Sequence, residues 1–218
     1  MVEVLSEACE LAAISLLAVA SFYDLKDRAV PDRVWLVGSA LGISMKLFDH
    51  EGTLQFILKA WPFLMLLAIM LALEWFLSLS GQADVLAYAT LSLLLTGNRM
   101  FPDALLTYLL SKIFIVLLIP VQFFINMSKV LRNPNLMKDF DEPFWRKLLA
   151  MMILSPYDKR LATCASPAEV LIDGRRKFVL KAALRISCDE PVEGGWIAPT
   201  YPAIPMILAA ALVVILAP

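Results

Sequence analysis

The sequence predicts an all-α membrane protein with six transmembrane helices and a cytoplasmic insertion between helices five and six. Hydrophobic residues make up 60% of the 218 residues, against about 45–50% apolar residues in a soluble domain. The mean hydropathy is +0.75. Charged residues make up 18%, and the net charge is −1. This balance excludes a basic nucleic-acid-binding protein and an acidic disordered chain.

Six apolar runs supply the expected helices, because a helix crosses the hydrocarbon core with about 17–25 apolar residues. The fourth run is short and rich in small residues, so we expect other helices to surround it. The runs are Val4–Tyr23, Val34–Phe48, Leu54–Leu79, Asp84–Leu95, Ala104–Met127 and Ala203–Ala217.

A polar stretch, 128–195, separates the last two runs. It holds 12 of the 19 Lys and Arg residues and 9 acidic residues. Its Asn, Asp, Pro and Gly clusters are typical of turns, and it also carries paired apolar residues such as Phe144-Trp145. We therefore expect three regions: 1–127 with five helices and the catalytic core, 128–195 as a soluble or interfacial insertion, and 196–218 with the sixth helix.

The distribution of basic residues predicts the orientation in the membrane. Lys26, Arg28 and Arg33 lie between the first two runs, and with the insertion they account for 15 of the 19 basic residues. Basic residues concentrate on the cytoplasmic side. The prediction is a multi-pass protein of the cell membrane, with both termini outside and the insertion in the cytoplasm.

Metal and disulfide chemistry find no support in the sequence. The three cysteines, Cys9, Cys164 and Cys188, are widely spaced and form no CxxC pair. The single histidine, His50, cannot build a histidine metal site and lies in a polar connector. We therefore expect no metal and no cofactor.

Two carboxylates are expected at the same depth on the cytoplasmic side, namely Asp24 at the end of the first run and Asp84 at the start of the fourth. Two carboxyl groups within hydrogen-bond reach share one proton and can act as acid and base around a water molecule. Plainer interpretations stay open: Asp84 as a helix N-cap, Asp24 as a solvated residue, and Glu74 as a rival acid or a structural hydrogen-bond partner.

Two further segments are expected at this depth. Gly81 stands three residues before Asp84, and glycine allows a tight turn or the close approach of another chain. Pro202-Ala203-Ile204-Pro205 begins the last run, where the prolines leave backbone groups without helical partners, although they also suit a simple helix start. Gly81, Pro202, Ala203, Ile204 and Pro205 are therefore candidate substrate-binding residues.

These segments resemble the motifs of type IV prepilin peptidases, above all the archaeal preflagellin and prepilin peptidases with six transmembrane helices. The stretch 21–32 resembles the first motif, in which Asp24 is followed by a basic residue and a proline, here Arg28 and Pro31. Gly81-Gln82-Ala83-Asp84 is similar to the second motif, GxGD, except that Ala83 replaces glycine. Pro202–Pro205 resembles the proline-rich start of the last helix, as in the PAL motif of the related presenilins.

The resemblance implies an aspartic endopeptidase with Asp24 and Asp84 as catalytic residues and no metal. It also implies the substrate, a membrane-anchored precursor that loses its short basic leader at the cytoplasmic border of the bilayer. The zinc loop and methyltransferase activity of the bacterial enzymes do not carry over, because the chain has no CxxC pair. The alternatives are a presenilin-like protease that cuts within substrate helices, and a non-catalytic membrane subunit or transporter.

Overall fold

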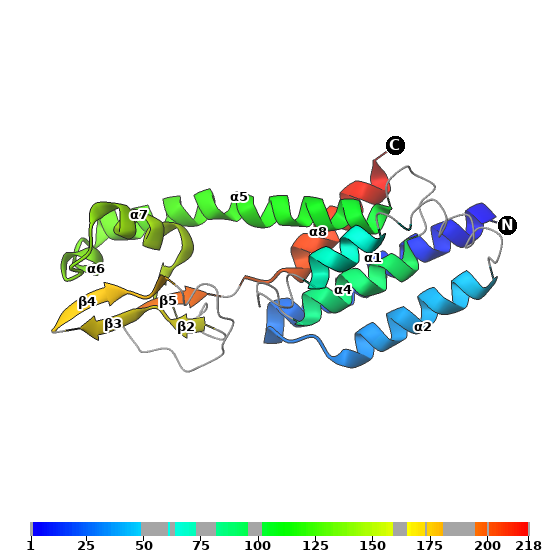
Figure 1. Ribbon diagram of the computed structural model, residues 1–218, viewed down its shortest axis with the longest axis horizontal. Helices are drawn as coiled ribbons and strands as arrows, with labels where there is room; N and C mark the ends of the chain where they lie inside the picture. The colour runs from blue at the N-terminus through cyan, green and yellow to red at the C-terminus, as the bar shows by residue number, and fades with distance from the viewer. Residues whose placement is uncertain are drawn as a thin grey trace. The chain divides into compact units, whose positions relative to one another are not determined.

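Two compact units make up the computed structural model of the chain (Figure 1). Unit 1 comprises residues 1–114 and 202–218, and unit 2 comprises residues 115–201. The structure describes residues 2–48, 61, 64–72, 82–95, 102–158, 165–172, 174–180, 195–199 and 201–217.

Unit 1 is helical. Helix α1 contacts α2, α4 and α8, and α2 also packs along α4 (Figure 1). The described part of the third apolar run, residues 61 and 64–72, is helical as well. The other elements are α1 (Val2–Asp27), α2 (Asp32–Phe48), α4 (Gln82–Leu94), the first part of α5 (Asp103–Arg132) and α8 (Ile204–Leu216).

Two of the described helices are long and apolar enough to cross a bilayer, Glu7–Asp27 and Asp103–Arg132. Ala83–Leu94 and Ile204–Leu216 are also apolar but shorter. Large apolar side chains such as Phe22 and Leu36 point away from the core and are exposed, as expected for surfaces that meet lipid rather than water. The expected six crossings therefore stay a prediction.

Small residues line the core of unit 1. Ala13, Leu17 and Ala20 recur at three- and four-residue intervals along α1 and are fully buried. They meet Ala87 and Leu91 of α4 in one apolar cluster. Close helix packing through small side chains is the usual source of helix association in membranes, where burial of apolar surface supplies no driving force.

A GxxxG pair, Gly38 and Gly42, brings α2 against its neighbours. A Cβ atom added at Gly42 would lie 2.9 Å from Leu93 Cβ and 3.1 Å from the Leu93 backbone carbon. At Gly38 it would lie 2.7 Å from Thr90 Cγ2. The two glycines therefore set the distance between α2 and α4.

Lys112 of α5, whose role the sequence leaves open, lies against two aromatic rings. Its Nζ is 5.2 Å from the centre of the Tyr108 ring and 5.7 Å from that of Tyr88. The Tyr88 hydroxyl is hydrogen-bonded to Ser111 Oγ at 2.6 Å. A cation over ring faces is stabilised by the ring quadrupoles, so the charge of Lys112 has partners inside the helical unit.

Short strands in unit 2 depart from the all-α prediction, although the chain is mostly helical. A three-stranded antiparallel sheet has the order β1-β5-β2, and β3 pairs with β4 in a separate hairpin. The elements are α6 (Asn135–Lys138), α7 (Phe144–Ile153), β1 (Ser155–Pro156), β2 (Ala165–Pro167), β3 (Glu169–Ile172), β4 (Arg175–Phe178) and β5 (Trp196–Pro199).

Three aromatic side chains form the core of unit 2. The rings of Phe140 and Phe178 stack 3.9 Å apart, and Trp196 meets both of them edge-on. Glu169 holds this core to the sheet, because its Oε2 accepts hydrogen bonds from Arg176 at 2.6 Å and from the Trp196 backbone N–H at 3.0 Å. Unit 2 therefore has a core of its own.

Replacing Gly42 with valine should force α2 away from α4, because the new side chain would overlap the Leu93 backbone. Overpacking of this kind costs about 1–3 kcal/mol. Ala40→Val, on the exposed side of the same helix, is the matched control. Unfolding of both variants by SDS from a mild detergent measures the difference; equal midpoints for the two would contradict the close contact.

Candidate active site

Asp24 lies in the last turn of α1 and is half-buried. Its Oδ2 accepts a hydrogen bond from the backbone N–H of Ile204 at 3.1 Å. Ile204 is the first residue of α8, so a carboxylate from the first helix binds the start of the last. Negative charge is favourable there because the helix macrodipole is positive at its N-terminus.

Within the first turn of α8 itself, the backbone donors from Ile204 to Ile207 have acceptors. Pro205 has no N–H to satisfy. The N–H groups of Met206 and Ile207 both donate to the Ala203 carbonyl, each at 3.0 Å. The remaining donor of the first turn, Ile204, is bound by Asp24. One carboxylate oxygen thus satisfies the Ile204 N–H, whereas the use of other backbone groups of Pro202–Pro205 by a substrate stays a prediction.

Arg28 immediately follows α1 and has a left-handed backbone, with φ at 52°. Glycine usually occupies this position after a helix, since a side chain raises its energy by about 1–2 kcal/mol. The guanidinium interacts electrostatically with Asp24. Its Nη1 is buried and has no hydrogen-bond partner among the described residues. Strain of this kind gathers at functional sites, and a cation with an unused donor is available beside the carboxylate.

Asp84 lies in the first turn of α4 and is half-buried. Its neighbours Ala83 and Ala87 join the apolar cluster that also contains Ala20, one turn before Asp24, and Ile204. The structure thus brings α1, α4 and α8 into one apolar cluster, and it joins Asp24 directly to Ile204. Gly81, Glu74 and His50 lie outside the described residues.

Within the residues that the structure describes, no three His, Cys, Asp or Glu side chains are grouped closely enough to hold a metal ion. The described side chains offer carboxyl groups that can take part in acid–base chemistry, with a helix N-terminus and one guanidinium beside Asp24.

The model of the type IV leader peptidase family matches residues 11–121. The chain belongs to this family. Searches of curated proteins and of solved structures give no match. The matched stretch contains both Asp24 and Asp84, whereas Pro202–Pro205 and all of unit 2 beyond residue 121 lie outside it.

Family membership implies a protease that acts on membrane-anchored precursors. The two long apolar helices agree with a membrane protein of this family. Sequence reasoning missed the strained backbone of Arg28, although the residue stands in the first motif. It also missed the direct bond to Ile204, for which the helix-breaking prolines were the available signal.

Because Asp24 accepts the bond from Ile204, two substitutions can test its structural role apart from its catalytic role. Asp24→Ala removes the acceptor and should lower the free energy of unfolding by about 0.5–2 kcal/mol, as for other lost helix caps. Asp24→Asn keeps an acceptor oxygen and should stay close to wild type. Thermal or SDS-induced unfolding in detergent compares them; equal losses in both variants would contradict the capping geometry.

Proposed function

We propose that this protein is an aspartic endopeptidase that removes the short basic leader from preflagellin- or prepilin-like precursors. The observation that carries the proposal is the family match across residues 11–121, which includes both motif aspartates. The position of Asp24 at the start of α8 supports it, because Asp24 is held there at the edge of an apolar helical cluster.

The proposed chemistry uses Asp24 and Asp84 as a pair that shares one proton. The ionised carboxylate takes a proton from water, and the oxygen attacks the carbonyl carbon of the scissile peptide. The protonated carboxyl donates to the carbonyl oxygen. The tetrahedral intermediate then collapses as the amide nitrogen takes a proton and the C–N bond breaks. Because such a pair titrates as one unit, neither aspartate is assigned as the base.

Asp24 is suited to this role by the bond it already makes. Its Oδ2 is fixed by the Ile204 N–H, which leaves Oδ1 to turn toward water or a second carboxyl group. Arg28 supplies a buried donor beside it, which in this proposal binds the substrate chain. A preorganised carboxylate needs no rearrangement of its own when the substrate arrives.

The substrate would lie with its hydrophobic helix in the bilayer and its leader in the cytoplasm. In the proposed topology of six helices, both aspartates lie at the cytoplasmic border, which is the level of the junction between leader and helix. An extended junction could pair with exposed backbone, and we assign that role to Gly81 and to Pro202–Pro205. Because the basic leader lies in the cytoplasm, its removal requires an active site that is open to the cytoplasm.

The decisive test is cleavage of a preflagellin-like precursor in membranes. Wild type should release the leader just before the hydrophobic run. Asp24→Asn and Asp84→Asn should each slow cleavage by at least the factor of about 10²–10⁴ that acid–base groups contribute. Asp27→Asn, three residues from Asp24 on the exposed end of the same helix, is the matched control and should cleave like wild type. Mass spectrometry of the products locates the cut.

Three results would contradict the proposal. Cleavage at the wild-type rate by folded Asp24→Asn or Asp84→Asn would remove the pair as the catalytic groups. A cut inside the hydrophobic run of the substrate would replace leader removal by presenilin-like intramembrane proteolysis. No cleavage by folded wild type would favour a non-catalytic membrane subunit.

A further inference from the structure

Helix α7 of unit 2 has an outward face without a single polar side chain. Phe144 and Trp145 are 78% and 58% exposed, and Leu149 is exposed as well. With the half-buried Leu148 and Met152, they follow the spacing i, i+1, i+4, i+5, i+8. This spacing places all five on one side of a helix. We call this set the α7 apolar face.

The charged residues of α7 point the other way. Arg146 donates through Nη2 to the Phe178 carbonyl at 3.3 Å, and its Nη1 pairs with Glu142 at 2.9 Å. Lys147 donates to the Met137 carbonyl at 3.4 Å. A helix on the surface of a water-soluble domain turns its charges outward. In α7 the charges bond within unit 2 and the aromatic residues face outward.

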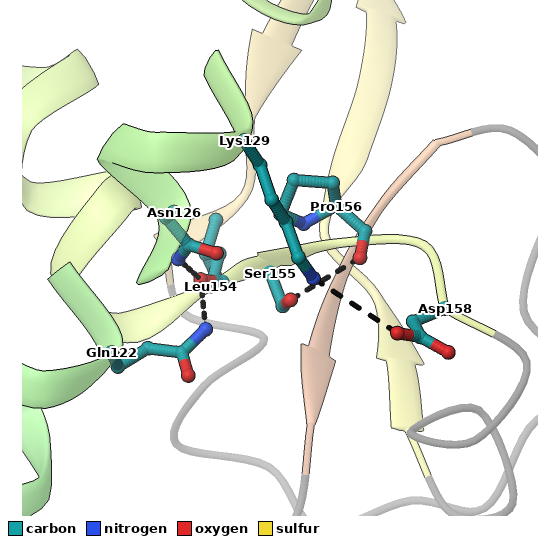
Figure 2. Close-up of polar contacts among 7 residues, drawn as sticks. All are labelled: Gln122, Asn126, Lys129, Leu154, Ser155, Pro156 and Asp158. Atoms are coloured by element: carbon teal, nitrogen blue, oxygen red, sulfur yellow. Dashed lines mark hydrogen bonds and ion pairs between the residues drawn. The ribbon is translucent and has the colours of Figure 1, made fainter. Parts of the chain in front are cut away.

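The end of α7 is fastened to α5 (Figure 2). Asn126 of α5 is fully buried, and its Nδ2 donates to the carbonyls of Met151 at 2.8 Å and Leu154 at 2.5 Å. Gln122, one turn earlier, donates to the Leu154 carbonyl at 3.4 Å. In unit 2, α7 is therefore held to the stretch of α5 around residues 122–126.

That stretch is where α5 reaches the end of a bilayer crossing. Counted from Ala104, the ~20 residues that span the hydrocarbon core are complete near residue 123. Exposed apolar side chains are frequent up to Ile125. The last turns of α5 carry the polar residues Asn126, Ser128, Lys129 and Arg132, although Leu131 is exposed as well. Since α7 is bonded to α5 at this level, it lies beside the headgroup region of the bilayer.

We infer that the α7 apolar face inserts into the interfacial region of the same bilayer that α5 crosses. Trp and other aromatic side chains favour the level of the headgroups, and an amphipathic helix lying in the membrane plane immerses its apolar face about 5–10 Å. The inference rests on α5 as a membrane span and does not depend on peptidase activity. The face holds unit 2 against the membrane by apolar insertion, not by charge.

Spin labels on full-length protein in nanodiscs test this inference. Single cysteines at Trp145, Leu148 and Leu149 are labelled in a background with Cys9, Cys164 and Cys188 replaced by serine. Leu171→Cys is the matched control, because Leu171 is an apolar residue of β3 that is 68% exposed. Collision rates with oxygen, which partitions into lipid, and with a water-soluble nickel chelate give the depth of each label.

The α7 labels should collide more often with oxygen than with nickel, and the label at 171 should show the reverse. Equal accessibility at 145 and 171 would overturn the inference. So would α7 labels shielded from both reagents, which would indicate a protein partner. Brominated lipids give a second reading without the cysteine changes: they should quench wild-type fluorescence more strongly than that of Trp145→Phe, and equal quenching would also overturn it.

Discussion

A backbone N–H at the start of a helix cannot be left without an acceptor in or beside a bilayer, where water is scarce. In this protein the Ile204 N–H meets that requirement through Asp24, a residue 180 positions earlier in the chain. The remaining donors of the turn are removed by Pro205 or bonded to the Ala203 carbonyl. This bond joins the end of the first helix to the start of the last and holds the catalytic candidate there, beside the apolar cluster in which the two helices pack.

Other polar side chains of the helices also contact specific partners. Lys112 Nζ lies over the rings of Tyr88 and Tyr108, and Asn126 donates to two carbonyls where the chain leaves α7. These side chains join the helices at a few specific points, whereas the buried Nη1 of Arg28 has no hydrogen-bond partner among the described residues. Between those points small residues such as Gly42 and Ala20 let the backbones approach.

The helices were predictable because a long apolar run that crosses a membrane satisfies its backbone hydrogen bonds by forming a helix. The expected spans 34–48 and 84–95 agree with α2 and α4 within two residues at each end. The expected end of the first run at Tyr23 is four residues short of the observed one, because helical hydrogen bonding continues through Asp24 and Lys26 after hydrophobicity stops. The strands of unit 2 have two to four residues, too few for a period to show.

The sequence predicted which residues belong to the candidate site, but not their conformation or their partners. Asp24 and Asp84 stand out because carboxylates at the ends of apolar runs are expensive. Their sequence says nothing of the left-handed backbone of Arg28 or of the partner that Asp24 binds, since these depend on contacts between distant segments. The joint position of both aspartates in one active centre remains a proposal that rests on the family.

The bond between Asp24 and Ile204 also sets an order of events during synthesis. Asp24 is made with the first helix, whereas its partner is made only after the whole of unit 2 has been translated. Until residue 204 has left the ribosome, the carboxylate has no helix to bind and the start of α8 does not exist. A nascent chain that has not yet reached residue 204 therefore lacks the bond that joins its first helix to α8.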